Sequence, residues 1–154
     1  FLTLNTTDAN SNITGASPPT SSVFSNTLFG ASENFIAYCF ANSDIIKAGS
    51  YVGNGSTDGP YIHLNFRPAW IMAKDASVSG QEWTIYDAKR GPSNVVLKLL
   101  SPTNSGAEAT APPTYDFLSS GFKLRSSDAR ENRSGSTFIY LAFAEHPFKY
   151  ANAR

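Results

Sequence analysis

Apolar and polar side chains alternate along the middle of the chain with a period of two. Between residues 61 and 66 the sequence YIHLNF places Ile, Leu and Phe at every second position. This period is typical of a strand with one face in a core and the other in water. The preceding Gly53–Pro60 is rich in residues that form turns, and Arg67-Pro68 interrupts the strand that follows. The pattern predicts strands at Tyr51-Val52 and Tyr61–Phe66, joined by a loop that reverses the chain.

Further short apolar runs continue to residue 144, separated by Gly, Pro, Asn and Ser. No segment sustains the apolar i, i+3, i+4 spacing of a helix, and Asp128–Asn132 is expected to form a single turn. Short, regularly spaced strands predict an all-β fold, specifically an antiparallel β-sandwich of the jelly-roll or lectin-like type. The further expected strands are Ala69–Lys74, Glu82–Asp87, Val95–Leu100, Tyr115–Leu118, Phe122–Arg125 and Thr137–Ala144.

The chain contains an imperfect internal repeat. Phe1–Leu4 resembles Val96–Leu99, a double proline follows each, and Asn34–Ala41 resembles Thr137–Ala144. The two copies lie roughly 100 residues apart, a period that indicates tandem domains and not a solenoid.

This repeat predicts the domain organisation. Residues 1–42 are interpreted as the C-terminal half of a preceding unit, residues 45–147 as a complete β-sandwich, and residues 148–154 as a C-terminal tail. A half unit cannot complete its own sheet. It is therefore expected to pack on the second unit, on another copy of the chain, or on sequence outside this chain.

The composition of the chain argues against two classes of function, nucleic-acid binding and membrane insertion. The 12 basic and 12 acidic residues cancel, and no basic stripe appears, so nucleic-acid binding is not expected. No apolar run approaches the roughly 20 residues of a membrane span, so no membrane insertion is expected. The single cysteine, Cys39, lies in the apolar run Phe35–Ala41 and is predicted to be a small buried side chain.

The types and spacing of the residues give little support for a catalytic site or a metal site. Glu82 and Asp87 flank a short aromatic run, as a glycosidase requires, but their five-residue offset puts them on opposite faces of an extended strand. His63 and His146 are isolated and lack the spacing of metal ligands. We therefore expect no catalytic residues, no metal and no cofactor.

Sugar binding has better candidates, because aromatic rings stack on sugars while amides, carboxylates and guanidinium groups bond their hydroxyls. An alternative remains open, in which the aromatic residues belong to the core and the polar ones form turns. The two candidate sets are Tyr51, Asn54, Asp58 and Tyr61, and Trp83, Tyr86, Asp87 and Arg90.

Several longer motifs carry a family resemblance. They are Gly49–Pro60, Phe66–Trp70, Asp116–Arg125 and Tyr140–Lys149. Together they resemble a domain common in large virion proteins of tailed bacteriophages, a family of unknown function, and Phe35–Ala41 fits the end of a preceding copy. The resemblance implies location in the virion, contact with other virion proteins, a homo-oligomer (a trimer, as in phage fibres) and no catalytic residues.

The leading hypothesis is a non-enzymatic tail-fibre or spike module that binds a bacterial surface polysaccharide and so mediates host adhesion. A second is a capsid decoration or fibre-assembly domain without a ligand, and a third, disfavoured by the acid spacing, is a polysaccharide depolymerase. A receptor-binding module is expected to leave Trp83 or Tyr61 facing solvent in a groove, whereas a decoration domain is expected to bury both.

Overall fold

The fold is all-β, as the alternation predicts. The computed structural model describes residues 2, 4, 6–12, 20, 22–23, 34, 36–91 and 94–146. Within these residues eight strands form one antiparallel sheet, accompanied by a single one-turn helix. The elements are β1 (Ile46–Val52), β2 (Tyr61–His63), β3 (Pro68–Asp75), β4 (Thr84–Asp87), β5 (Val96–Leu100), β6 (Ala109–Leu118), β7 (Gly121–Leu124), α1 (Ala129–Asn132) and β8 (Thr137–Ala144).

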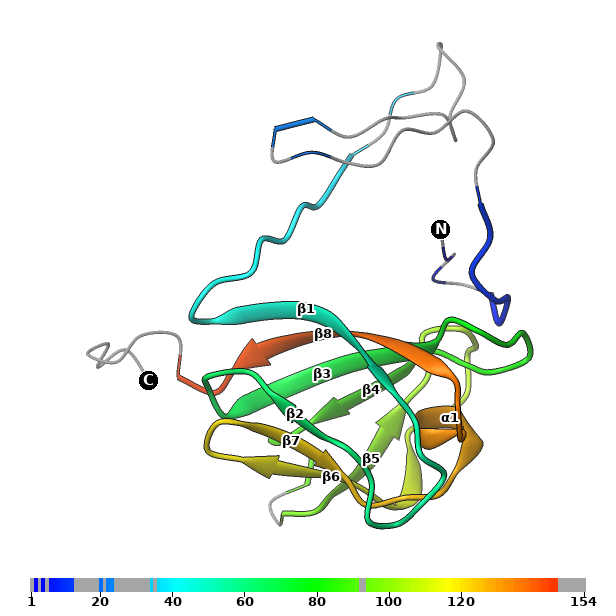
Figure 1. The fold of residues 1–154 in the computed structure, drawn as a ribbon, viewed down its shortest axis with the longest axis vertical. Coiled ribbons are helices and arrows are strands. Elements are labelled where there is room, and N and C mark those ends of the chain that lie inside the picture. The colour runs from blue at the N-terminus through cyan, green and yellow to red at the C-terminus, as the bar shows by residue number, and fades with distance from the viewer. Residues whose placement is uncertain are drawn as a thin grey trace.

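The sheet curls so that its two halves face each other (Figure 1). The strand order is β1-β8-β3-β4-β5-β6-β7-β2, so the first two strands of the chain lie at opposite edges. The ring of Tyr51 on β1 lies 6.1 Å from that of Phe122 on β7. Phe122 also meets Tyr140 of β8 edge-on at 5.4 Å. One continuous, nearly closed sheet thus supplies both layers of a sandwich-like fold.

Aromatic rings fill the space between the layers. Tyr51 and Phe138 are stacked, with ring centroids 5.0 Å apart and planes inclined by 6°. Tyr86 and Tyr115 meet at 4.7 Å in a T-shaped arrangement. Tyr115 in turn contacts Phe122 at 5.5 Å. These contacts link β1, β4, β6, β7 and β8, so the core holds both halves of the sheet together.

The strands expected after residue 50 appear near their predicted positions, although β1 and β6 begin well before the predicted starts at Tyr51 and Tyr115. The alternation in Tyr61–Phe66 is confirmed, because Ile62, Leu64 and Phe66 are buried while the residues between them are exposed. Pairing ends at His63, however, and the prediction of a six-residue strand is too long. Asn65 adopts a φ of 70°, a left-handed conformation that takes the backbone out of the strand.

The prediction of a local chain reversal at Gly53–Pro60 is wrong. β1 pairs with β8 and β2 pairs with β7, so the strands flanking this loop are not neighbours. The loop instead joins the two edges of the curled sheet. Sequence periodicity identifies strands and turns, but it contains no information about which strands pair.

The apolar run Phe35–Ala41 does not form a strand in its described part. Phe35 lies outside the described residues, and residues 36–41 are exposed without strand pairing. Ile36 is 81% exposed and Tyr38 80%. Cys39 is exposed too, so the expectation that it is buried is wrong. An apolar strand is buried only where a partner strand and a second layer cover it, and neither is present here among the described residues.

The N-terminal residues nevertheless touch the main sheet. The carbonyl of Thr7 accepts a hydrogen bond from Gly80 N at 2.8 Å, and Asn10 N donates to Ala76 O at 2.8 Å. The division at residues 42–45 into a half unit and a complete unit stays a prediction.

Replacing Phe138 with Ala is expected to lower the free energy of unfolding by about 3–5 kcal/mol, because a fully buried ring stacked on Tyr51 is lost. Urea denaturation measures the change. Val52, which is 59% exposed, provides the control, since Val52→Ala is expected to change the value by less than about 0.5 kcal/mol. A loss below about 1 kcal/mol in Phe138→Ala contradicts the core assignment.

Candidate functional site

The loop between β1 and β2, residues 53–60, is fixed by main-chain hydrogen bonds to two distant segments. Gly53 N donates to Ser136 O at 2.9 Å, and Gly55 N donates to Asn132 O at 2.8 Å. Gly59 N donates to Leu124 O at 3.1 Å. A Cβ at position 59 would lie 2.5 Å from the Leu124 Cβ, so only glycine permits this approach. The loop is therefore tied both to β7 and to the segment before β8.

The buried carboxamide of Asn132 organises the same loop. Asn132 closes α1, whose N-cap Asp128 accepts a hydrogen bond from Arg130 N. Its Oδ1 accepts from Asn54 N at 2.9 Å. Its Nδ2 lies 3.0 Å from Asn54 Oδ1 and 2.8 Å from both Ser56 O and Ser126 O. Because Asn132 is 0% exposed, these bonds are shielded from water and hold the loop in one conformation.

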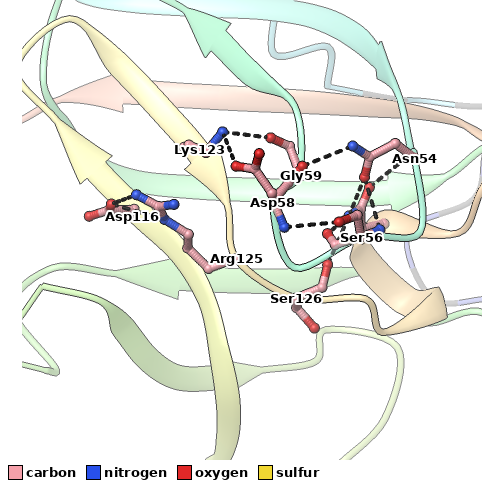
Figure 2. A network of polar contacts seen from close by, with 9 residues as sticks. Asn54, Ser56, Asp58, Gly59, Asp116, Lys123, Arg125 and Ser126 are labelled. Atoms are coloured by element: carbon pink, nitrogen blue, oxygen red, sulfur yellow. Dashed lines mark hydrogen bonds and ion pairs between the residues drawn. The ribbon is translucent and has the colours of Figure 1, made fainter.

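Charged side chains meet beside the loop, on the outer face of β6, β7 and β2 (Figure 2). Lys123 Nζ lies 2.8 Å from Asp58 Oδ1 and donates to Gly59 O at 3.0 Å. Arg125 pairs with Asp116 at 2.9 Å. The hydrogen bond from Lys123, and its charge, hold the pKa of Asp58 below its usual value. Lys123 on β7 and Arg125 just after it thus present two cations outward, each paired with a carboxylate.

An exposed aromatic ring completes this face. Tyr61 on β2 stands directly opposite Lys123 on β7, and Lys123 stands opposite Asp116 on β6. Residues that are opposite in an antiparallel sheet share a face. Tyr61 is 45% exposed, and its hydroxyl lies 2.8 Å from Ser120 Oγ. We call the face formed by Asp58, Tyr61, Asp116, Lys123 and Arg125 the polar platform.

A shallow hollow of about 410 Å³ adjoins the polar platform. Its lining is more apolar than polar, although the residues around it carry hydroxyl groups, a carboxylate and the Arg125 guanidinium. These groups can donate to and accept from a polyhydroxylated ligand while an exposed ring stacks on its apolar face. The lining residues are Thr57, Pro112, Arg125, Ser126, Ser127 and Asp128.

A buried polar cluster lies in the core at the α1 end. Tyr86 donates its hydroxyl hydrogen to Glu131 Oε1 at 2.8 Å, and Tyr51 donates to the Glu131 carbonyl at 2.8 Å. The Tyr51 and Tyr115 hydroxyls are 3.3 Å apart. Glu131 is 1% exposed, and burial raises its pKa to about 7, although the hydrogen bond from Tyr86 acts in the opposite direction. Burial also raises the pKa of both Tyr51 and Tyr86. The cluster connects α1 to β1 and β4.

Three residues of the first sequence-predicted set come together at this site. Asn54 and Asp58 lie in the β1–β2 loop, where Asn54 Nδ2 donates to Asp58 O at 3.0 Å, and Tyr61 follows on β2. Tyr51 is only 7% exposed, because its ring belongs to the core, so it cannot stack on a ligand at the surface.

The second predicted set does not form one surface. Trp83 is 7% exposed and Tyr86 is 0%, so both rings are buried. Asp87 Oδ1 accepts from Lys89 N at 2.7 Å within its own turn, and Arg90 pairs with Glu108 at 3.3 Å. The aromatic members are core residues and the polar members stabilise turns and surface pairs, which is the alternative that the sequence left open.

The sequence-predicted sets lack five of the residues described above: Asp116, Lys123, Arg125, Glu131 and Asn132. Lys123 and Arg125 alternate with buried Phe122 and Leu124 in a predicted strand, so their outward direction could be inferred. Asn132 and Glu131 give no such signal, because a polar pair in a predicted surface turn is ordinarily exposed.

The described residues show neither a metal-ligand cluster nor a membrane-spanning helix. No group of three or more His, Cys, Asp or Glu side chains in this part of the chain is arranged to hold a metal ion. No helix among the same residues has the length and apolar character that crossing a membrane requires.

The protein is expected to lose stability as the pH rises from about 5 to 8. The folded state holds a proton on Glu131 up to about pH 7, whereas the unfolded chain releases it near 4.5. The folded state binds more protons in this window, so the loss in unfolding free energy is on the order of 3 kcal/mol. Glu131→Gln is expected to flatten this dependence in urea titrations at several pH values. Glu108→Gln is the control, and an unchanged slope in Glu131→Gln contradicts the assignment.

Asn132→Ala is expected to lower the unfolding free energy by about 2–4 kcal/mol, because it leaves buried loop groups without partners. Amide hydrogen exchange in residues 53–59 is expected to accelerate at least about tenfold, since the loop loses its central anchor. Asn104→Ala removes a carboxamide from an exposed position and serves as the control. If amide exchange in the loop is unchanged, the main-chain hydrogen bonds alone hold the loop, and the role given to the Asn132 carboxamide is wrong.

Comparison with known proteins gives a family without an assigned activity. Searches of curated proteins and of solved structures find no match. A family model described as a domain of unknown function, DUF7483, matches residues 1–147. This match spans nearly the whole chain, so the protein belongs to the DUF7483 family.

Proposed function

We propose that this protein is a non-enzymatic module of a bacteriophage virion, at a tail fibre or spike, that binds a bacterial surface polysaccharide through the polar platform. The observation that carries the proposal is the position of Tyr61. Its ring is 45% exposed and stands beside Lys123, which bridges to Asp58 of the fixed loop. The virion context rests on the sequence resemblance to phage proteins.

The arrangement suits a sugar ligand. A tyrosine ring stacks on the apolar face of a pyranose, and neighbouring charged and hydroxyl groups bond its hydroxyls. The hollow beside Arg125 extends these polar groups along the surface, as a chain of several sugars requires. Because Asn132 already fixes the loop, ligand binding has little loop entropy to overcome.

The carboxylates around the platform favour binding over hydrolysis. Asp58 pairs with Lys123, Asp116 with Arg125, and Asp128 with Arg130. A glycosidase needs one protonated carboxyl group as general acid. Lys123 lowers the pKa of Asp58, and the pKa of Asp128 is lowered too, because burial is outweighed by the bonds of its carboxylate to Arg130. Glu131 has the raised pKa of such an acid, but it is buried in the core, where no polysaccharide can reach it.

A decoration or fibre-assembly domain without a ligand is the alternative. Such a domain is expected to bury both Trp83 and Tyr61. Trp83 is buried, but Tyr61 is exposed next to polar groups, which favours the receptor-binding proposal. Tyr61 is not among the residues that line the neighbouring hollow, so the groove expected around its ring is not part of this support.

The test is binding of the purified protein to an array of bacterial capsular and lipopolysaccharide glycans. Tyr61→Ala and Lys123→Ala are each expected to weaken binding to the recognised glycan at least about tenfold, the equivalent of about 1.4 kcal/mol. Thermal unfolding of Tyr61→Ala is expected to stay near that of the wild type, because Tyr61 is 45% exposed. Lys123→Ala also loses the bond to Gly59 O, so its affinity is measured well below its own unfolding temperature.

Lys89→Ala is the matched control, since the Lys89 side chain is 79% exposed and lies outside the platform. Tyr61→Phe keeps the ring and is expected to retain most of the affinity. If the wild type binds no glycan, or if Tyr61→Ala binds as the wild type does, the proposal is wrong.

A further inference from the structure

The half of the sheet away from the polar platform has an apolar outer surface. The pairing registers align side chains from five adjacent strands in one row, and a second row from three strands lies beside it. All of these residues are half-buried or exposed. The first row is Ala48, Leu141, Met72, Ile85 and Leu100, and the second is Ile46, Phe143 and Trp70. We call these two rows the apolar outer face.

An antiparallel sheet ordinarily buries one face and exposes a polar one to water. The layer of β6, β7 and β2 follows this rule, because its outer side carries the polar platform. The layer of β1, β8, β3 and β4 follows it only in part, because apolar rows occupy much of its outer side. Asp87 stands beside Trp70 at one end, and Lys74, on the same side of β3, is buried and donates to Thr7 O. A large apolar surface at a protein's exterior marks an interaction site.

The chain itself contains a segment of matching chemistry. Residues 36–41 present three large apolar side chains at every second position, with Ile36 81%, Tyr38 80% and Phe40 50% exposed. Phe40 already lies edge-on against Phe143, with centroids 5.7 Å apart. Phe143 in turn contacts Trp70 at 5.4 Å. An aromatic side chain of this segment therefore fits the apolar outer face.

Apart from Phe40, the side chains of residues 36–41 do not cover the apolar outer face of their own chain. The turn into β1 is fixed by Ser43 N donating to Ile46 O at 2.8 Å and by Ala48 N donating to Asn42 Oδ1 at 2.7 Å. Beyond this turn, Figure 1 shows residues 36–42 running away from the sheet. Ile36 and Tyr38 thus remain exposed, and most of the apolar outer face remains uncovered by them.

We propose that the apolar outer face is the contact surface between copies of this chain, with residues 36–41 of one copy packing on Trp70, Met72 and Leu141 of another. Both complementary parts belong to the same chain, so the exchange can be reciprocal and the contact self-complementary. With 12 basic and 12 acidic residues, the chain has no net charge to oppose self-association.

The size of the surface suits a weak, reversible contact. Its eight residues, on strands about 4.8 Å apart and at roughly 6.8 Å intervals along each strand, cover on the order of 260 Å². The exposed side chains of residues 36, 38 and 40 add roughly 300–400 Å². The sum of roughly 560–660 Å² per partner lies at the low end of specific interfaces. The polar platform lies on the other layer and stays accessible in such an assembly.

Disulfide trapping tests which copy supplies the segment. Cys39 is the only cysteine of the chain, and it alternates with Tyr38 and Phe40, so its side chain points away from a surface that these two contact. The triple variant Cys39→Ser, Tyr38→Cys, Met72→Cys instead supplies one cysteine on the segment and one on the apolar outer face. Under mild oxidation of the full chain, this variant is expected to give a covalent species of higher mass on non-reducing gels. The control Cys39→Ser, Tyr38→Cys, Tyr61→Cys, with its second cysteine on the polar platform, is expected to give at least about fivefold less of it. Only an intrachain disulfide, or no product above this control, overturns the proposal.

Sedimentation velocity provides a second measurement that needs no cross-link. The wild type is expected to self-associate, and Tyr38→Asp is expected to raise the dissociation constant at least about tenfold, because a charge enters the apolar contact. Tyr38 is 80% exposed, so this variant does not endanger folding. Tyr61→Asp introduces the same change on the polar platform and is expected to associate as the wild type does. A wild type that stays monomeric, or an unchanged constant in Tyr38→Asp, overturns the proposal.

Discussion

The closure of the sheet depends on the bonds that hold its two edges at the β1–β2 loop. β1 lies at one edge and β2 at the other, and eight residues connect them. The buried Asn132 carboxamide, with the main-chain bonds of Gly53, Gly55 and Gly59, fixes this connection to β7 and to the segment before β8. Without these bonds the polar groups of the loop would have to bond to water. The two edges of the sheet would then no longer be held together at this loop.

This closure also places the candidate site. Asp58 reaches Lys123 because the loop crosses to the edge formed by β2 and β7. Lys123 stands opposite Asp116 on β6, and Asp116 in turn pairs with Arg125. The polar platform is thus a consequence of the crossing connection, and a simple hairpin between β1 and β2 would have separated these side chains.

The two layers differ in what they present outward. One exposes charge and a tyrosine ring, and the other exposes aliphatic and aromatic rows that continue onto Phe40. A module that binds a ligand on one side and its own copies on the other would display several ligand sites from one assembly. Weak individual sites gain strongly from such multivalency, because the second contact becomes intramolecular.

The buried Glu131 cluster shows how far the interior departs from a purely apolar core. Three tyrosine hydroxyls and one carboxyl group share hydrogen bonds at the end of the sandwich beneath α1. Buried groups of this kind must be fully satisfied to be tolerated, so they favour one arrangement of β1, β4 and α1 over alternatives. The raised pKa of Glu131 is the electrostatic consequence of placing a carboxyl group there.

The sequence by itself determined the strands, the turns and the all-β class, because alternation and turn chemistry are local properties of the chain. It also placed Tyr61 on the side of its strand opposite to Ile62 and identified the turn residues Asn54 and Asp58, but it left open whether the Tyr61 ring lies in a core. Only the tertiary structure decided that β1 and β2 do not pair, that Tyr51, Trp83 and Tyr86 are core residues, and that Asn132 is buried. These outcomes depend on which strands become neighbours and on which layer covers each face, and such long-range contacts leave no periodic signal in the sequence.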